Sequence, residues 1–266
     1  MLHVSFVPEV ETGPPVILVH SLFEELNRGR AIGARLGRWL AGQGRALHVL
    51  DVAGTGDSFG RLETASPLAW QADLAALARQ LDAGQGVDWL AFRAGALWLP
   101  QVSVCGAFPL RNLHLLNPVL NGKTFLTQFL RLRVAAARFE GREETVASLR
   151  ALAEAQGSVE VAGYRLGAGL ISELDALELC VPQGGGVCNL VEMAAGPGAP
   201  GVPFARLLEK ASAGGWQTAY TRVEDLKFWM SQELCPAAAL VETLGASVIE
   251  ETARSGAGAN SAPASN

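Results

Sequence analysis

Residues 56–60, with the sequence GDSFG, have the Gly-x-Ser-x-Gly pattern that presents a serine nucleophile in many enzymes. Such a serine needs a sharp turn that joins a buried strand directly to a helix, with small residues two positions before and after it. Ser58 does not meet this requirement, because it lies in a glycine-rich loop and the next helical pattern begins only near Pro67. The glycines permit tight turns there, and Asp57 and Ser58 can hydrogen-bond to local backbone. We therefore predict that Ser58 has a structural role.

The turn that a nucleophile would need follows the next apolar run, Val87–Phe92. Ala91 and Gly95 are the small residues that flank the central position, but that position holds Arg93. A guanidinium group stays protonated and cannot attack a carbonyl carbon. The sequence therefore excludes serine chemistry at this turn.

A serine mechanism also needs an acid and a histidine base. The predicted strand Gly186–Met193 offers Glu192 as the acid, although a solvated carboxylate at a strand end is an equal alternative. The base should follow the last predicted strand, Trp216–Val223, but no histidine lies there. All histidines precede residue 120, so the sequence supplies one member of the three.

Two acidic residues, Glu24 and Glu25, follow the apolar run that ends at His20-Ser21. In an enzyme with a serine nucleophile on such a turn, a loop at this position can bind the oxyanion through a backbone N–H group, and two carboxylates would repel the oxyanion unless they were paired. Arg93 is their natural partner, because burial of an unpaired arginine is costly. The alternative is that both carboxylates lie in a solvated loop.

Short apolar runs alternate with helical patterns on both sides of these residues. Runs of this kind are typical of strands covered on both faces, and the alternation predicts an α/β fold with a mostly parallel sheet and helices on both faces. Residues 123–179 interrupt the alternation, and within them residues 123–156 carry two amphipathic helical patterns and no strand. We predict a core of residues 1–122 and 180–250, a helical cap of residues 123–179 and a disordered tail of residues 251–266. The predicted elements are strands at 2–8, 14–21, 46–52, 87–92, 112–119, 186–193 and 216–223, and helices at 30–42, 67–81, 94–104, 204–213 and 236–243.

This layout resembles the α/β-hydrolase superfamily, with the inserted segment as a cap. Several motifs resemble one branch of it, the second type of hydrolase associated with exosortase A systems in bacteria. The chain departs from that branch at Gly29 and in the stretch DLKFW, where a glycine is expected before Phe-Trp. The resemblance implies an α/β-hydrolase-like protein of the cytoplasm, in bacteria that make exopolysaccharide, with an arginine at the elbow and no defined substrate. The motifs are Phe23–Arg30, Leu50–Gly60, Phe92–Leu97, Asn117–Arg133, Val161–Leu170, Leu190–Met193 and Phe228–Pro236.

Two functions are compatible with these residues. The first is an ester-type hydrolase without the usual triad, in which Arg93 and Ser21 bind an anionic or acyl substrate and Glu192, Glu24 or Glu25 activates water. The second is a non-catalytic anion-binding or scaffolding protein. Arg131 and Arg133 of the cap would extend an anion site in either case, or else form an exposed helix face.

The composition excludes several other classes of protein. The net charge of −5 argues against nucleic acid as a partner, because nucleic acid needs a basic surface. The four cysteines lack metal-binding spacing, and we predict reduced thiols and no metal or cofactor. No run of 18 apolar residues and no secretory signal is visible, which predicts a cytoplasmic protein without a membrane span. The sequence does not identify a protein partner.

Overall fold

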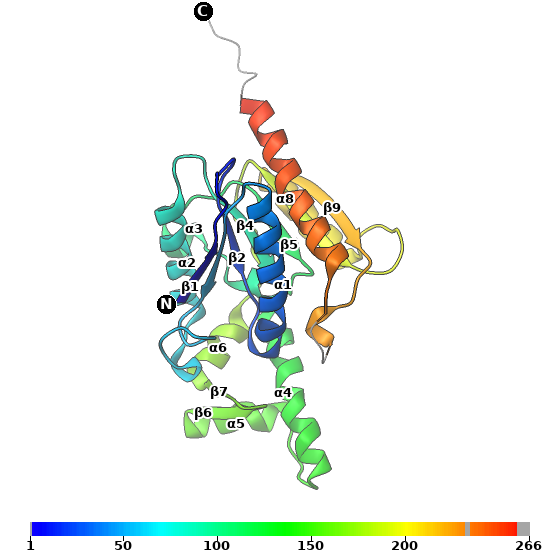
Figure 1. Cartoon of the computed structure of the whole chain (residues 1–266). Helices are drawn as coiled ribbons and strands as arrows, with labels where there is room; N and C mark the ends of the chain where they lie inside the picture. Colours follow the sequence, from blue (N-terminus) through cyan, green and yellow to red (C-terminus); the bar gives the residue numbers. More distant parts are fainter. Residues whose placement is uncertain (1, 232–234, 260–266) are drawn as a thin grey trace, which may run out of the picture.

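The computed structural model describes residues 2–231 and 235–259, with side chains up to residue 250. Within these residues seven strands form one sheet (Figure 1). The first strand pairs antiparallel with its neighbour at one edge, and all other pairings are parallel. The prediction of a mostly parallel sheet is thus confirmed. The spatial order is β1 (Leu2–Phe6), β3 (Leu47–Asp51), β2 (Val16–Val19), β4 (Asp88–Phe92), β5 (Leu113–Leu116), β8 (Val187–Met193) and β9 (Gln217–Val223).

Helices cover both faces of this sheet, as the continuous apolar runs of its central strands predict. One face packs against α1 (Phe23–Gly42) and α8 (Ala238–Ala259), which lie side by side in Figure 1. The opposite face packs against α2 (Pro67–Leu81) and α7 (Val202–Ala213). The sequence predicts a disordered tail over residues 251–266, but helix α8 continues through the first part of this segment and ends at Ala259. Residues 260–266 lie outside the described part of the chain.

The inserted segment lies together at one end of the sheet (Figure 1). It contains the two helices that the sequence predicts, α4 (Gly122–Phe139) and α5 (Val146–Gln156), and a third, α6 (Ala168–Ala176). It is not wholly helical, because β6 (Ser158–Val161) and β7 (Tyr164–Gly167) form an antiparallel hairpin between α5 and α6. The hairpin turn is Ala162-Gly163, and both residues have positive φ, as tight two-residue hairpin turns require. Each strand of the hairpin has only four residues and lacks the continuous apolar run of a buried strand, so the sequence pattern did not reveal it.

The helix expected over residues 94–104 is absent. Six residues after β4 form a 3₁₀ helix, η2 (Arg93–Trp98), and the short helix α3 (Val102–Cys105) follows after a break. The break comes before Pro100, because a proline disfavours helical geometry at the residue that precedes it, and Leu99 accordingly has ψ of 137°. Two other 3₁₀ helices are η1 (Leu62–Thr64) and η3 (Phe228–Met230).

Candidate functional site

The turn at the carboxyl end of β4 keeps the geometry of a nucleophile elbow. Arg93 follows the strand directly and has φ of 54°, a strained conformation for a residue other than glycine. Ala91 is fully buried between its sheet partners in β2 and β5. A Cβ atom on Gly95 would collide with the carbonyl oxygen of Val19, so this position requires glycine. The sharp bend and its small flanking residues are therefore present, and the side chain that they display is an arginine.

Arg93 is held by three groups around it. Its Nη2 lies 3.3 Å from Oε1 of Glu25, its Nη1 donates a hydrogen bond of 3.0 Å to the carbonyl oxygen of Asn117, and its Cζ lies 4.4 Å from the ring centroid of Trp229. A guanidinium group over an indole face gains from the cation–π attraction. The side chain is 17% exposed, so the positive charge is balanced within the protein by Glu25.

The two acidic residues at the start of α1 have different partners. Glu25 accepts a hydrogen bond of 2.7 Å from Oγ of Ser21 in addition to the ion pair with Arg93, so these three predicted site residues lie together. Glu24 instead accepts a hydrogen bond of 2.9 Å from the hydroxyl group of Tyr164, in β7 of the inserted segment. Burial, and then the charge of Glu24, raise the pKa of Tyr164 to about 12, so its proton is firmly held. Glu24 therefore joins α1 to the hairpin.

Glu192 has a hydrogen-bond partner outside this group. It accepts a hydrogen bond from the hydroxyl group of Tyr220 on the neighbouring strand β9, and burial followed by the charge of Glu192 raises the pKa of Tyr220 to about 12. Among the described residues, no hydrogen bond or ion pair joins Glu192 to Arg93. The structure thus gives no support to Glu192 as the acid of a triad at the elbow.

The two arginines of α4 lie apart from the elbow. Arg133 makes a bidentate ion pair with Glu144, with both distances 2.8 Å, and donates a third hydrogen bond to the carbonyl oxygen of Glu160. It therefore ties parts of the inserted segment together, and the side chain of Arg131 is exposed. Ser58 donates to the carbonyl oxygen of Asp51 and accepts a 2.6 Å hydrogen bond from the backbone N–H of Leu2, which is the structural role predicted for it.

A pocket of about 270 Å³ opens beside the elbow, between α1, α4 and η3. The aromatic rings of Phe23 and Phe129 are stacked in the wall of this pocket, with ring centroids 3.7 Å apart. Arg93 does not line the pocket and reaches it only through Glu25 and Trp229, which do. The lining is mostly apolar and aromatic, with three charged groups, and consists of Leu22, Phe23, Glu24, Glu25, Arg28, Phe125, Gln128, Phe129, Leu132 and Trp229.

The aromatic part of this wall was not predicted from the sequence. Phe125 and Phe129 are spaced i, i+4 and so share one face of α4, which was an available signal. Trp229 gave no such signal, because it comes from a distant segment and is brought to the pocket by the fold. Arg28 fixes it there by donating a hydrogen bond of 2.6 Å to the carbonyl oxygen of Trp229.

Within the described residues, His, Cys, Asp and Glu form no group of three that could hold a metal ion. None of the helices in that part of the chain is both long and apolar enough to cross a bilayer.

Comparison with solved structures assigns the fold. The chain is similar to Est1E from Butyrivibrio proteoclasticus with ferulic acid bound (TM-score 0.58, 14% identity, 95% of each chain covered). It is also similar to a putative hydrolase from Agrobacterium vitis S4 (TM-score 0.55, 12% identity, 94% of this chain and 92% of the other). A third similar structure is α/β hydrolase domain-containing protein 10 from mouse (TM-score 0.51, 13% identity, 93% and 92% covered).

No family model and no curated protein matches the sequence. The similar structures are consistently α/β-hydrolase-fold proteins, and the sheet and its helices have the same arrangement. The chain therefore has the α/β-hydrolase fold.

Proposed function

We propose that this chain is a ligand-binding protein that uses the α/β-hydrolase fold without serine catalysis. The observation that supports this most strongly is the paired guanidinium group of Arg93 at the elbow. An arginine there removes the nucleophile, and its guanidinium group is already paired with Glu25 and packed against Trp229. The pocket between α1, α4 and η3 lies beside this arginine, and its apolar walls with a few charged groups are typical of a ligand-binding site.

The lining indicates the chemical class of that ligand. Aromatic and aliphatic side chains favour an acyl chain or an aromatic ring. The charged groups are two carboxylates, Glu24 and Glu25, against one cation, Arg28, whose guanidinium already donates to Trp229. This balance favours a polar end that donates hydrogen bonds or carries positive charge. An anion would have to displace Glu25 from Arg93.

Binding of octylamine, octanamide and octanoate to the purified protein tests this proposal by calorimetry. We expect the amine to bind most tightly and octanoate least tightly. Leu132→Ala should weaken all complexes by about fivefold, because it removes apolar contact at the pocket wall. Arg131→Ala, at the adjacent exposed position on the same helix, is the matched control and should change nothing. Tighter binding of octanoate than of octylamine would instead support the anion site inferred from the sequence.

The second candidate function is hydrolysis by water that Glu25 activates. The observation that favours it is the position of this carboxylate, at the pocket and beside a fixed cation. Turnover of p-nitrophenyl acetate, p-nitrophenyl octanoate and an octanoyl thioester separates the two functions. We expect none above background. Turnover that is lost in Glu25→Gln and Arg93→Ala but kept in Arg131→Ala would establish a hydrolase.

The association with an exosortase and exopolysaccharide system is also a proposal, and it is supported by the sequence motifs alone, as is a location in the cytoplasm. It predicts that deletion of the gene in its own bacterium changes the amount of secreted polysaccharide or the sorting of envelope proteins. Complementation with the Arg131→Ala gene should restore the phenotype. Unchanged polysaccharide and unchanged sorting would contradict the association.

A further inference from the structure

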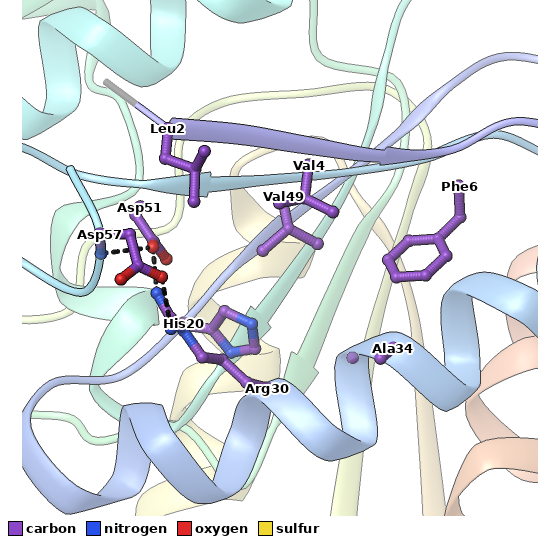
Figure 2. A pocket seen from close by; sticks show the side chains of 10 residues that line it. Leu2, Val4, Phe6, His20, Arg30, Ala34, Val49, Asp51 and Asp57 are labelled. Carbon is purple, nitrogen blue, oxygen red and sulfur yellow. Dashed lines mark hydrogen bonds and ion pairs between the residues drawn. The ribbon is translucent and has the colours of Figure 1, made fainter.

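A second cavity, of about 180 Å³, lies between the edge strand β1, strand β3 and helix α1 (Figure 2). It shares no lining residue with the pocket between α1 and α4, so a ligand in this cavity would be independent of the proposed function. Leu2, Val4 and Phe6 line it from β1, Val49 lines it from β3, and Ala34 lines it from α1. Most of its wall is therefore apolar.

The charged groups at one end of the cavity neutralise one another. Arg30 makes an ion pair with Asp51 and a second one, of 3.2 Å, with Asp57. Asp51 also accepts a hydrogen bond of 3.1 Å from the backbone N–H of Asp57. Figure 2 shows these three side chains directed toward one another. Because each charge already has a partner, this end offers no strong site for an ion.

His20 is the polar group that lacks partners. Its side chain lines the cavity, the residue is 5% exposed, and neither ring nitrogen has a hydrogen-bond partner among the described residues. Burial, and then the charge of Arg30, lower the pKa of His20 to about 3, so the ring is neutral near pH 7. A neutral imidazole has one N–H donor and one nitrogen acceptor, and each unsatisfied buried group costs about 1–3 kcal/mol.

The surroundings of His20 hold the ring in place. Its edge packs against Phe92, with ring centroids 5.7 Å apart. On the other side α1 comes close because Gly29 and Gly33 have no side chains. A Cβ atom on Gly33 would lie 2.8 Å from Leu18 and 3.2 Å from the imidazole. The imidazole is therefore confined between the sheet and the helix.

We infer that this cavity binds a small uncharged molecule, about the size of one aromatic ring, whose hydroxyl group hydrogen-bonds to His20. The volume fits, because an apolar cavity of about 150 Å³ can hold benzene. A hydroxyl group both donates and accepts, so it suits either nitrogen of the neutral ring. The apolar walls would cover the rest of the molecule, and the paired charges would exclude an ion.

Phenol and toluene test this inference, because they have nearly the same shape and only phenol carries a hydroxyl group. In calorimetric titrations we expect phenol to bind the wild-type protein about tenfold more tightly than toluene, the usual effect of one buried hydrogen bond. In His20→Leu the two affinities should agree within about threefold. Ala34→Phe, which fills the cavity, should abolish the binding event in which phenol is preferred over toluene. Leu132→Ala, in the other pocket, should leave that event unchanged.

Nitrogen NMR of the His20 ring gives a second readout that needs no variant. Phenol, but not toluene, should shift one of its ring nitrogen resonances. Equal affinities for phenol and toluene, or a ring resonance that phenol does not move, would overturn the inference. If neither molecule binds the wild-type protein, the cavity holds water only and the inference is likewise wrong.

Discussion

Lowering the pH from 6.5 to 5 is expected to reduce the free energy of unfolding by about 3 kcal/mol through His20 and His114. His48, whose pKa burial and then the charge of His3 lower to about 4, adds to this loss. Burial, and then the charges of Arg30 and Arg45, respectively, lower the pKa of His20 and of His114 to about 3. In the unfolded chain each pKa returns to its ordinary value near 6.5. At a pH between the folded and the unfolded pKa values, the imidazole is protonated in the unfolded chain and neutral in the folded protein. The free energy of unfolding therefore falls as the pH falls.

Urea unfolding at half-unit steps of pH measures this effect. The chosen window lies above the range in which carboxylates with ordinary pKa values titrate, so the histidines dominate the slope. His20→Leu and His114→Leu should each remove about 1.5 kcal/mol of the loss. His20 directly follows β2 and His114 lies in β5, so the two residues act independently. A slope that neither substitution changes would show that the folded protein accepts protons on these rings.

The sheet could be predicted because its central strands are buried on both faces. Residues such as Val16–Val19 and Leu113–Leu116 are continuous apolar runs with no competing interpretation. The elbow could be located for a related reason: the small residues Ala91 and Gly95 are demanded by close packing against the neighbouring strand. The packing of neighbouring backbone segments requires small residues at these positions, so the sequence reveals the turn even where the catalytic residue is missing.

Contacts between distant segments could not be predicted in the same way. The pattern of α4 gives no sign that Arg133 faces Glu144 instead of the crevice, because the partner is chosen by how the inserted segment folds back. Glu192 lies near the end of the right strand for a triad acid, yet it is hydrogen-bonded to Tyr220 on the next strand. The expected helix after Arg93 was wrong because the effect of Pro100 outweighs the helical pattern around it. The sequence was therefore enough to locate the central arginine of the candidate site, but the structure was needed to identify the residues around it.

Asp88→Ala is expected to destabilise the protein by about 3–5 kcal/mol, the range for breaking a buried ion pair by removal of one partner. Asp88 is 0% exposed at the start of β4, and its Oδ2 lies 2.7 Å from Nη2 of Arg45, whose side chain is 1% exposed. Arg111 lies 3.6 Å from the same oxygen. Removing the carboxylate leaves the guanidinium of Arg45 buried without its counter-ion, and that uncompensated charge is the source of the cost.

The position of this pair makes the experiment selective. Asp88 and Arg93 stand at opposite ends of β4, so loss of the carboxylate should lower stability without reshaping the pocket beside the elbow. Urea unfolding should therefore show a large fall for Asp88→Ala, while octylamine binding under conditions that keep the protein folded stays unchanged. Glu63→Ala, which breaks the more exposed pair with Arg61, is the matched control and should cost less than about 1 kcal/mol. Equal losses for the two variants would mean that water reaches Arg45, and the ion pair at the base of the sheet would then be an ordinary surface contact.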